Sequence, residues 1–267
     1  MEWTAEQLGA LFPALTAQIR GSLSNLALAV RDVLPDEERE AHPEKDRKAA
    51  RMDQSYYVLL RLLENIANTD WLLGKRTPRR QSCEIVRMVS DICVESTDLF
   101  QDQGKALSFK VPSKEHVCLA DPGAIRTALY HLLSNALKFT PVGGWVRVEL
   151  RLRGGQVLLS VTNSGDGISD DLARFLADNS ANPPSPPPHG LGLGLPLCRA
   201  IAEAHGGRLL AETRPGKQCR MTLAFPDEGG TVLRDPCPVV YNDGFNKTLL
   251  GLADALPASA FCLRGQD

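Results

Sequence analysis

The sequence predicts an α+β fold in which a two-helix hairpin precedes a domain built from one sheet with helices on one of its faces. With 43% hydrophobic and 23% charged residues among 267, the chain has enough apolar side chains for a sizeable core. Apolar residues recur at steps of three and four through about the first 75 positions, which is the period of long amphipathic helices. Beyond about residue 80, short alternating segments typical of strands are interspersed with helical segments.

Two apolar stripes define the hairpin, which we assign to residues 1–75. The first stripe ends at Pro35, and the charged segment 35–48 has no periodicity, so we expect it to be a connection. Stripes of this length exceed what one hairpin can bury in its own seam, so we expect two chains to form a four-helix bundle. A monomeric hairpin lying on the second domain is the alternative. The stripes comprise Leu8, Leu11, Leu15, Ile19, Leu23, Leu26, Val30 and Val33, then Met52, Tyr56, Leu59, Leu63, Ile66 and Leu73.

The second predicted domain covers residues 80–226 and follows a basic, proline-containing linker at 74–80. Pro122 suits the first turn of a helix, the pair Gly206-Gly207 suits a helix end, and Gly154-Gly155 suits the turn of a β-hairpin. Residues 227–267 form a C-terminal extension, in which 243–257 could be one amphipathic helix docked on the domain. The predicted helices span 85–100, 122–138 and 196–205, and the predicted strands span 107–111, 116–119, 146–152, 156–162 and 221–225.

Charge and composition exclude several classes of function. The 30 basic and 32 acidic residues give a net charge of −2, so no basic field indicates nucleic acid or an anionic membrane. No apolar run approaches the roughly 20 residues of a membrane span, and Met1 opens an acidic segment, so we expect a soluble cytoplasmic protein. The seven cysteines form no CxxC pair and the five histidines no HExxH, which favours reduced core thiols over a disulfide framework or a protein-held metal.

A polar face on the helix over 122–138 is the first candidate for chemistry. His131, Asn135 and Lys138 are four and three positions apart and therefore line one side of a helix. An amide oxygen next to a cation suits a Mg²⁺-polyphosphate, because the amide oxygen can bind the metal and the cation the phosphate oxygens. A solvated polar face of an amphipathic helix is the alternative interpretation.

Two glycine-bearing turns are the second and third candidates. Asn163 ends a strand that runs into Gly165 and Gly167, where a flat ligand can approach the backbone, although an ordinary β-turn has the same composition. A second turn precedes a helix, so its N–H groups can form an anion cradle, although one glycine-rich turn is weak evidence. This turn contains Gly190, Gly192 and Gly194, with Leu195 directly after them.

The order of these segments resembles the N-box, G1-box and G2-box of GHKL-type ATP-binding domains. HLLSNALKFTP (131–141) and HGLGLGLPL (189–197) closely resemble the motifs of sensor histidine kinases, and the resemblance covers roughly 225 residues. It implies a two-layer α/β sandwich with a mixed sheet, preceded by a dimerisation hairpin. It also implies ATP and Mg²⁺ as cofactors, and a response regulator or another signalling protein as a partner.

The resemblance also implies roles for the candidate residues. Asn135 would be the Mg²⁺ ligand and Lys138 a phosphate contact. His131 is the candidate catalytic residue, because hydrolytic GHKL relatives carry a glutamate base at its position; a neutral imidazole is less suited to activating water. Asn163 would contact adenine. The glycines would complete the site, with Gly165 and Gly167 beside base and ribose, and Gly190, Gly192 and Gly194, next to Leu195, at the phosphates.

The chain departs from the family's pattern where the phospho-acceptor would be. Ala17 replaces the acceptor histidine, and alanine has neither nucleophile nor base, so autophosphorylation there is chemically impossible. His42 in the connection, or Ser22 or Ser24, are remote substitutes. Asn163 replaces the aspartate of the G1-box, which we expect to weaken ATP binding by about 1–2 kcal/mol. The lid segment 182–189 is rich in proline and should be extended.

The sequence therefore predicts a histidine-kinase-like, Mg-ATP-binding signalling protein that cannot autophosphorylate at the usual position of its hairpin. Two alternatives remain open at this point. The chain could phosphorylate a partner protein in trans, or it could be a dimeric scaffold whose nucleotide site is vestigial.

Overall fold

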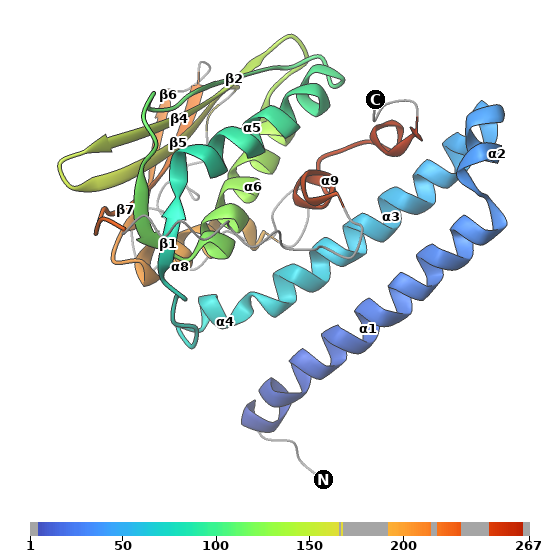
Figure 1. The fold of residues 1–267 in the computed structure, drawn as a ribbon, viewed down its shortest axis with the longest axis horizontal. Coiled ribbons are helices and arrows are strands. Elements are labelled where there is room, and N and C mark those ends of the chain that lie inside the picture. The colour runs from blue at the N-terminus through green and yellow to red at the C-terminus, as the bar shows by residue number, and fades with distance from the viewer. Residues whose placement is uncertain (1–4, 166, 168–191, 215–217, 231–245, 264–267) are drawn as a thin grey trace. The chain divides into compact units, whose positions relative to one another are not determined.

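The computed structural model describes residues 5–165, 167, 192–214, 218–230 and 246–263 (Figure 1). The chain divides into two compact units. Unit 1 comprises Met1–Thr69 and Leu256–Asp267, and unit 2 comprises Asp70–Ala255. The last residues of the chain therefore belong to the same unit as the first.

Unit 1 is a helical hairpin. Helix α1 (Ala5–Val33) packs against α3 (Pro43–Ala67), with the short α2 (Asp36–Ala41) between them. The prediction of an irregular connection at 35–48 is wrong, because this segment is almost entirely helical. Pro35 is extended and precedes three acidic residues in the first turn of α2, where negative charge stabilises a helix N-terminus.

A buried ion-pair network joins the end of the chain to the hairpin. The Arg39 guanidinium donates to Asp46 at 3.0 Å, to Asp53 at 2.9 Å and to the Phe261 carbonyl at 3.2 Å. Phe261 lies in η1 (Ala258–Phe261), a 3₁₀ turn that packs on α3, and its ring lies 5.4 Å from that of Tyr57. Residues 256–263 are thus an integral part of the hairpin unit.

Unit 2 contains a mixed five-stranded sheet in the order β2-β4-β5-β7-β6, which confirms the α+β prediction. The strands are β2 (Ala106–Lys110), β4 (Trp145–Arg153), β5 (Gln156–Ser164), β6 (Arg208–Arg214) and β7 (Gln218–Pro226). Strand β2 pairs parallel to β4, and the other pairs are antiparallel. A separate pair, β1 (Gln81–Glu84) with β3 (Val117–Ala120), was not predicted as a sheet of its own.

Three helices lie on one face of this sheet (Figure 1): α5 (Ile85–Gln101), α6 (Pro122–Phe139) and α8 (Gly194–Ala204). Helix α6 begins as predicted, with Pro122 in its first turn and the Asp121 carboxylate accepting from the Ala124 N–H at 3.0 Å. Its residues contact α8 and β5, so this helix lies at the centre of the domain.

Two short helices complete the described part of unit 2. Helix α4 (Thr69–Leu72) lies where the chain leaves unit 1, and α9 (Lys247–Leu252) packs on α6 and α5. A helix over 243–257 was predicted, but within the described residues only Lys247–Leu252 is α-helical before the chain returns to unit 1. No helix in the described ranges is both long and apolar enough to cross a bilayer.

Candidate functional site

Helix α6 carries three of the predicted site residues on neighbouring turns. His131 is buried, with 5% of its surface exposed, whereas Asn135 and Lys138 are half-buried. The side chain of Asn135 has no hydrogen-bond partner among the described residues, so its amide oxygen is available to a ligand. The helix holds these groups in place because its apolar residues are packed into the core of the domain.

The two glycine segments meet this helix at its middle and at its C-terminal end. A Cβ atom added to Gly194 would lie 3.1 Å from Nδ1 of His131, so the start of α8 abuts the middle of α6. A Cβ atom added to Gly165 would lie 2.6 Å from the Phe139 carbonyl oxygen, so the loop after β5 abuts the C-terminal end of α6. Three motifs that are far apart in the sequence are therefore neighbours in the fold.

Asn163 lies at the end of β5, where 9% of its surface is exposed. Its Nδ2 donates to the Ser164 carbonyl at 3.3 Å, which leaves its side-chain oxygen without a partner in the described part of the chain. Gly167 follows with φ +91°, a conformation that favours glycine. The end of β5 thus presents an amide oxygen beside a backbone free of side chains.

Only the last part of the predicted anion-binding turn before α8 lies within the described residues. Gly192 has φ +66°, and no side chain caps the N-terminus of α8, whose first residues are Gly194 and Leu195. Gly190 and the lid segment 182–189 lie outside the described residues.

An acidic residue that the sequence analysis did not single out contacts this face of α6. Asp254 accepts a hydrogen bond from Ser134 Oγ at 2.8 Å and forms an ion pair with Lys138 Nζ at 2.5 Å. The Lys138 side chain is 13% exposed. The contact brings together residues 116 positions apart, and no motif in the C-terminal extension points to it.

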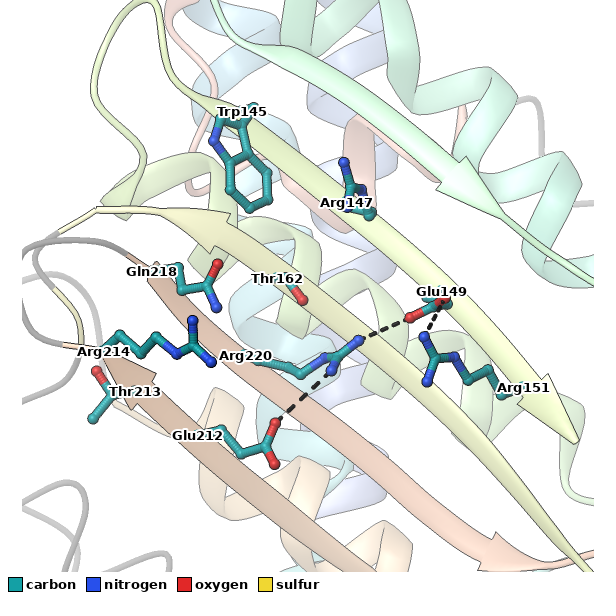
Figure 2. Close-up of a pocket in the computed structure, with 10 residues that line it drawn as sticks. All are labelled: Trp145, Arg147, Glu149, Arg151, Thr162, Glu212, Thr213, Arg214, Gln218 and Arg220. Carbon is teal, nitrogen blue, oxygen red and sulfur yellow. Dashed lines mark hydrogen bonds and ion pairs between the residues drawn. The ribbon is translucent and has the colours of Figure 1, made fainter. Parts of the chain in front are cut away.

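A cavity of about 490 Å³ in the described part of the chain lies elsewhere in unit 2. Figure 2 shows that its lining residues extend from strands of the five-stranded sheet. Those on β4 and β7 occupy the positions between the buried apolar residues of these strands, so they face away from α6 and α8. Glu149 accepts from Arg151 and Arg220, both at 2.8 Å. The cavity contains none of the predicted site residues, and its lining comprises Trp145, Arg147, Glu149, Arg151, Thr162, Glu212, Thr213, Arg214, Gln218 and Arg220.

Comparison with known proteins shows what this arrangement is similar to. Residues 120–229, which contain all three motifs, match the family described as histidine kinase-, DNA gyrase B-, and HSP90-like ATPase. The adaptive-response sensory kinase SasA of a Synechococcus strain is 35% identical over 128 residues, which are 46% of this chain and 34% of that protein. Over this stretch the chain is similar to sensor histidine kinases.

Other relatives extend the similarity beyond the ATPase-like domain. The sensor protein KdpD of Clostridium acetobutylicum is 25% identical over 224 residues, which are 82% of this chain and 24% of that protein. The fold resembles that of full-length ShkA, solved in complex with AMPPNP, with a TM-score of 0.64 and 22% identity over 86% of this chain and 47% of that one. The chain spans about a quarter to a third of the length of these two curated sensor histidine kinases.

Proposed function

We propose that this chain is a histidine-kinase-like signalling protein that binds Mg-ATP around α6 and does not autophosphorylate at the usual position of its hairpin. The observation that carries the proposal is the convergence of Gly165 and Gly194 on α6, beside Phe139 and His131. A Cβ atom at Gly165 would clash with the Phe139 carbonyl oxygen and one at Gly194 would lie tightly against His131, so glycine lets both turns approach α6 closely.

The residues around α6 fit a metal that arrives with the nucleotide. No group of three or more His, Cys, Asp or Glu side chains in the described ranges could hold a metal by itself. Mg²⁺ commonly takes one or two protein oxygens and completes its shell with phosphate and water, and the unpartnered amide of Asn135 can supply one such oxygen. When bound, Mg²⁺ would neutralise phosphate charge next to Lys138.

The described hairpin offers no acceptor at the usual position. Ala17 lies on an exposed part of α1 and has no nucleophilic atom. The only histidine of the hairpin is His42, which lies between α2 and α3 with its surface exposed and its side chain not capping α3. We therefore expect nucleotide occupancy, and not a phosphohistidine on α1, to be the signal that a partner protein reads.

Two measurements test this proposal. In titration calorimetry with Mg-ATP we expect saturable binding, lost in Asn135→Ala and tighter by about 1–2 kcal/mol in Asn163→Asp, because a carboxylate accepts a stronger hydrogen bond than an amide. With γ-labelled ATP we expect no label on the purified chain.

The other outcomes point to the alternatives. Label on the purified chain would contradict the proposal, and label on an added response regulator or on another protein would favour a kinase acting in trans. Absence of any nucleotide binding would leave a scaffold with a vestigial site.

A further inference from the structure

The C-terminal extension delivers one carboxylate to the face of α6 that carries the candidate phosphate contact. Asp254 directs one oxygen to Ser134 Oγ and the other to Lys138 Nζ. Ser134 and Lys138 are four residues apart and lie on either side of Asn135 in the sequence, so the carboxylate covers one turn of α6. Both oxygens of Asp254 are engaged with this helix.

Asp254 is held in place because the helix before it is firmly docked. The Asn246 side chain caps α9 by accepting from the N–H groups of Thr248 and Leu249 at 2.9 and 3.0 Å. Thr248 is buried and its hydroxyl donates to Glu95 on α5 at 2.5 Å and lies 2.9 Å from the Tyr130 hydroxyl on α6.

Shape complementarity strengthens this docking. Leu249 and Leu252 are buried, and a Cβ atom added to Gly251 would lie 2.4 Å from the Tyr130 ring, so α9 packs tightly on α6. Burial raises the pKa of Tyr130, whose protonated hydroxyl can then donate to Thr248. The carboxylate two residues after Leu252 is consequently fixed relative to α6.

The ammonium group of Lys138 is already paired with the Asp254 carboxylate. Its side chain is 13% exposed and that of Asp254 is 34% exposed, so the pair is partly shielded from water and from salt. A phosphate oxygen arriving at Lys138 meets an ammonium that is already paired, and it meets a second negative charge beside it.

We propose that Asp254 competes with the phosphates of the nucleotide for Lys138, so that the C-terminal extension holds the site in a state of low affinity. This inference rests on the proposed function, because it takes α6 as the nucleotide site. Binding of ATP must then separate Lys138 from Asp254, and a partner that pulled α9 away from α6 would raise the affinity for ATP. The C-terminal extension would thus regulate nucleotide binding by lowering the affinity of the site for ATP.

The test compares the full chain with Asp254→Asn, which removes the charge and keeps the size of the side chain and an oxygen for Ser134. We expect Mg-ATP to bind about three- to tenfold more tightly to the variant, because a partly shielded ion pair no longer opposes the phosphates. Adenosine, which has no phosphate, should bind both proteins equally. Glu228→Gln is the control, since it removes an equal charge from a surface pair with Arg80.

A second comparison separates competition from a structural effect of the substitution. In a chain that already carries Lys138→Met, adding Asp254→Asn should give a clearly smaller gain in affinity for Mg-ATP, because the contested ammonium is gone and only the repulsion between carboxylate and phosphate is removed. A gain of equal size in that background would overturn the proposal.

The result for Asp254→Asn alone is equally decisive. If the unmodified chain binds Mg-ATP and the variant binds it equally or more weakly, Asp254 positions Lys138 and does not compete, and the proposal is wrong while the proposed function stands. If neither protein binds Mg-ATP, the proposed function itself fails.

Discussion

At the scale of single residues, His205 is fixed as a neutral imidazole by two backbone groups. Its Nε2 accepts the Asp121 N–H at 3.0 Å, so the ring proton lies on Nδ1, which donates to the Ile201 carbonyl at 2.7 Å. The ring also packs near those of Trp71 and Phe225, with centroid distances of 6.4 and 5.8 Å. Burial lowers the pKa of His205, against the smaller opposing effects of the Ile201 carbonyl and the Asp121 charge.

This environment makes the stability of unit 2 depend on pH. Because the pKa of His205 is lower in the folded state than its ordinary value of 6.5, the unfolded chain takes up the proton first as the pH falls. We expect the contribution to be complete above pH 6.5 and to be lost progressively as the pH falls towards the folded pKa. Urea unfolding at a series of pH values checks this, with His205→Gln as the non-titrating variant. An equal pH slope in both proteins would contradict it.

The sequence was informative about residues that carry a motif and uninformative about their long-range partners. The spacing of His131, Asn135 and Lys138 predicted a shared helix face because helical geometry is local. The Asp254–Lys138 contact was not predictable in the same way. It depends on where α9 docks, because Asp254 follows this helix and lies 116 residues from Lys138. A single aspartate among apolar residues carries no motif that points to such a partner.

At the scale of elements, the junction between α8 and β6 depends on two adjacent glycines with different requirements. Gly206 has φ +76° and ends the helix, as predicted. Gly207 has an ordinary φ, but a Cβ atom there would lie 1.9 Å from the Ala224 carbonyl oxygen and 2.7 Å from Phe225 Cα. The first position needs a left-handed backbone, and the second needs the absence of a side chain.

Two substitutions distinguish these requirements. We expect Gly207→Ala to lower the free energy of unfolding by about 3 kcal/mol, because both clashing atoms belong to the backbone of β7 and cannot move aside. Gly206→Asn should cost less than about 1 kcal/mol, since asparagine tolerates the left-handed region and no heavy atom lies closer than 3.7 Å to the added Cβ. Chemical denaturation of both variants checks the ranking, which an equal loss would refute.

Elements with a strong internal pattern were predictable, and those defined by their surroundings were not. The strands β4, β5 and β7 carry apolar residues at every second position, and each lies close to its predicted position. Strand β6 is at the edge of the sheet and exposes most of its side chains, so its sequence lacks that alternation. The segment 35–48 escaped prediction because its helices are stabilised by charge and by the buried Arg39.

At the scale of the whole molecule, the hairpin unit exposes apolar side chains that the predicted bundle would cover. Leu15, Ile19 and Leu26 on α1 are 48%, 46% and 59% exposed, and Met52 and Leu59 on α3 are 55% and 44% exposed. Exposed apolar stripes of this kind on paired helices favour association with a second copy of the same hairpin.

We therefore expect light scattering to give about twice the 29.1 kDa mass of one chain. The double variant Leu15→Glu, Leu26→Glu should shift the mass to that of one chain, because it introduces charge into the apolar stripe and changes no residue of unit 2. Leu28→Glu alone is a surface control on the same helix. A mass near 29.1 kDa for the unmodified chain would refute the dimer.

The division of the chain into units has a consequence for how it can be dissected. Residues 70–255 are a continuous insertion between two parts of the helical unit, because the last residues pair with Arg39, Asp46 and Tyr57 of the hairpin. The insertion can be excised as one uninterrupted polypeptide, whereas a fragment that stops after α3 loses the carbonyl and the ring that complete its buried end. Shortening the C-terminus by a dozen residues accordingly damages the beginning of the protein.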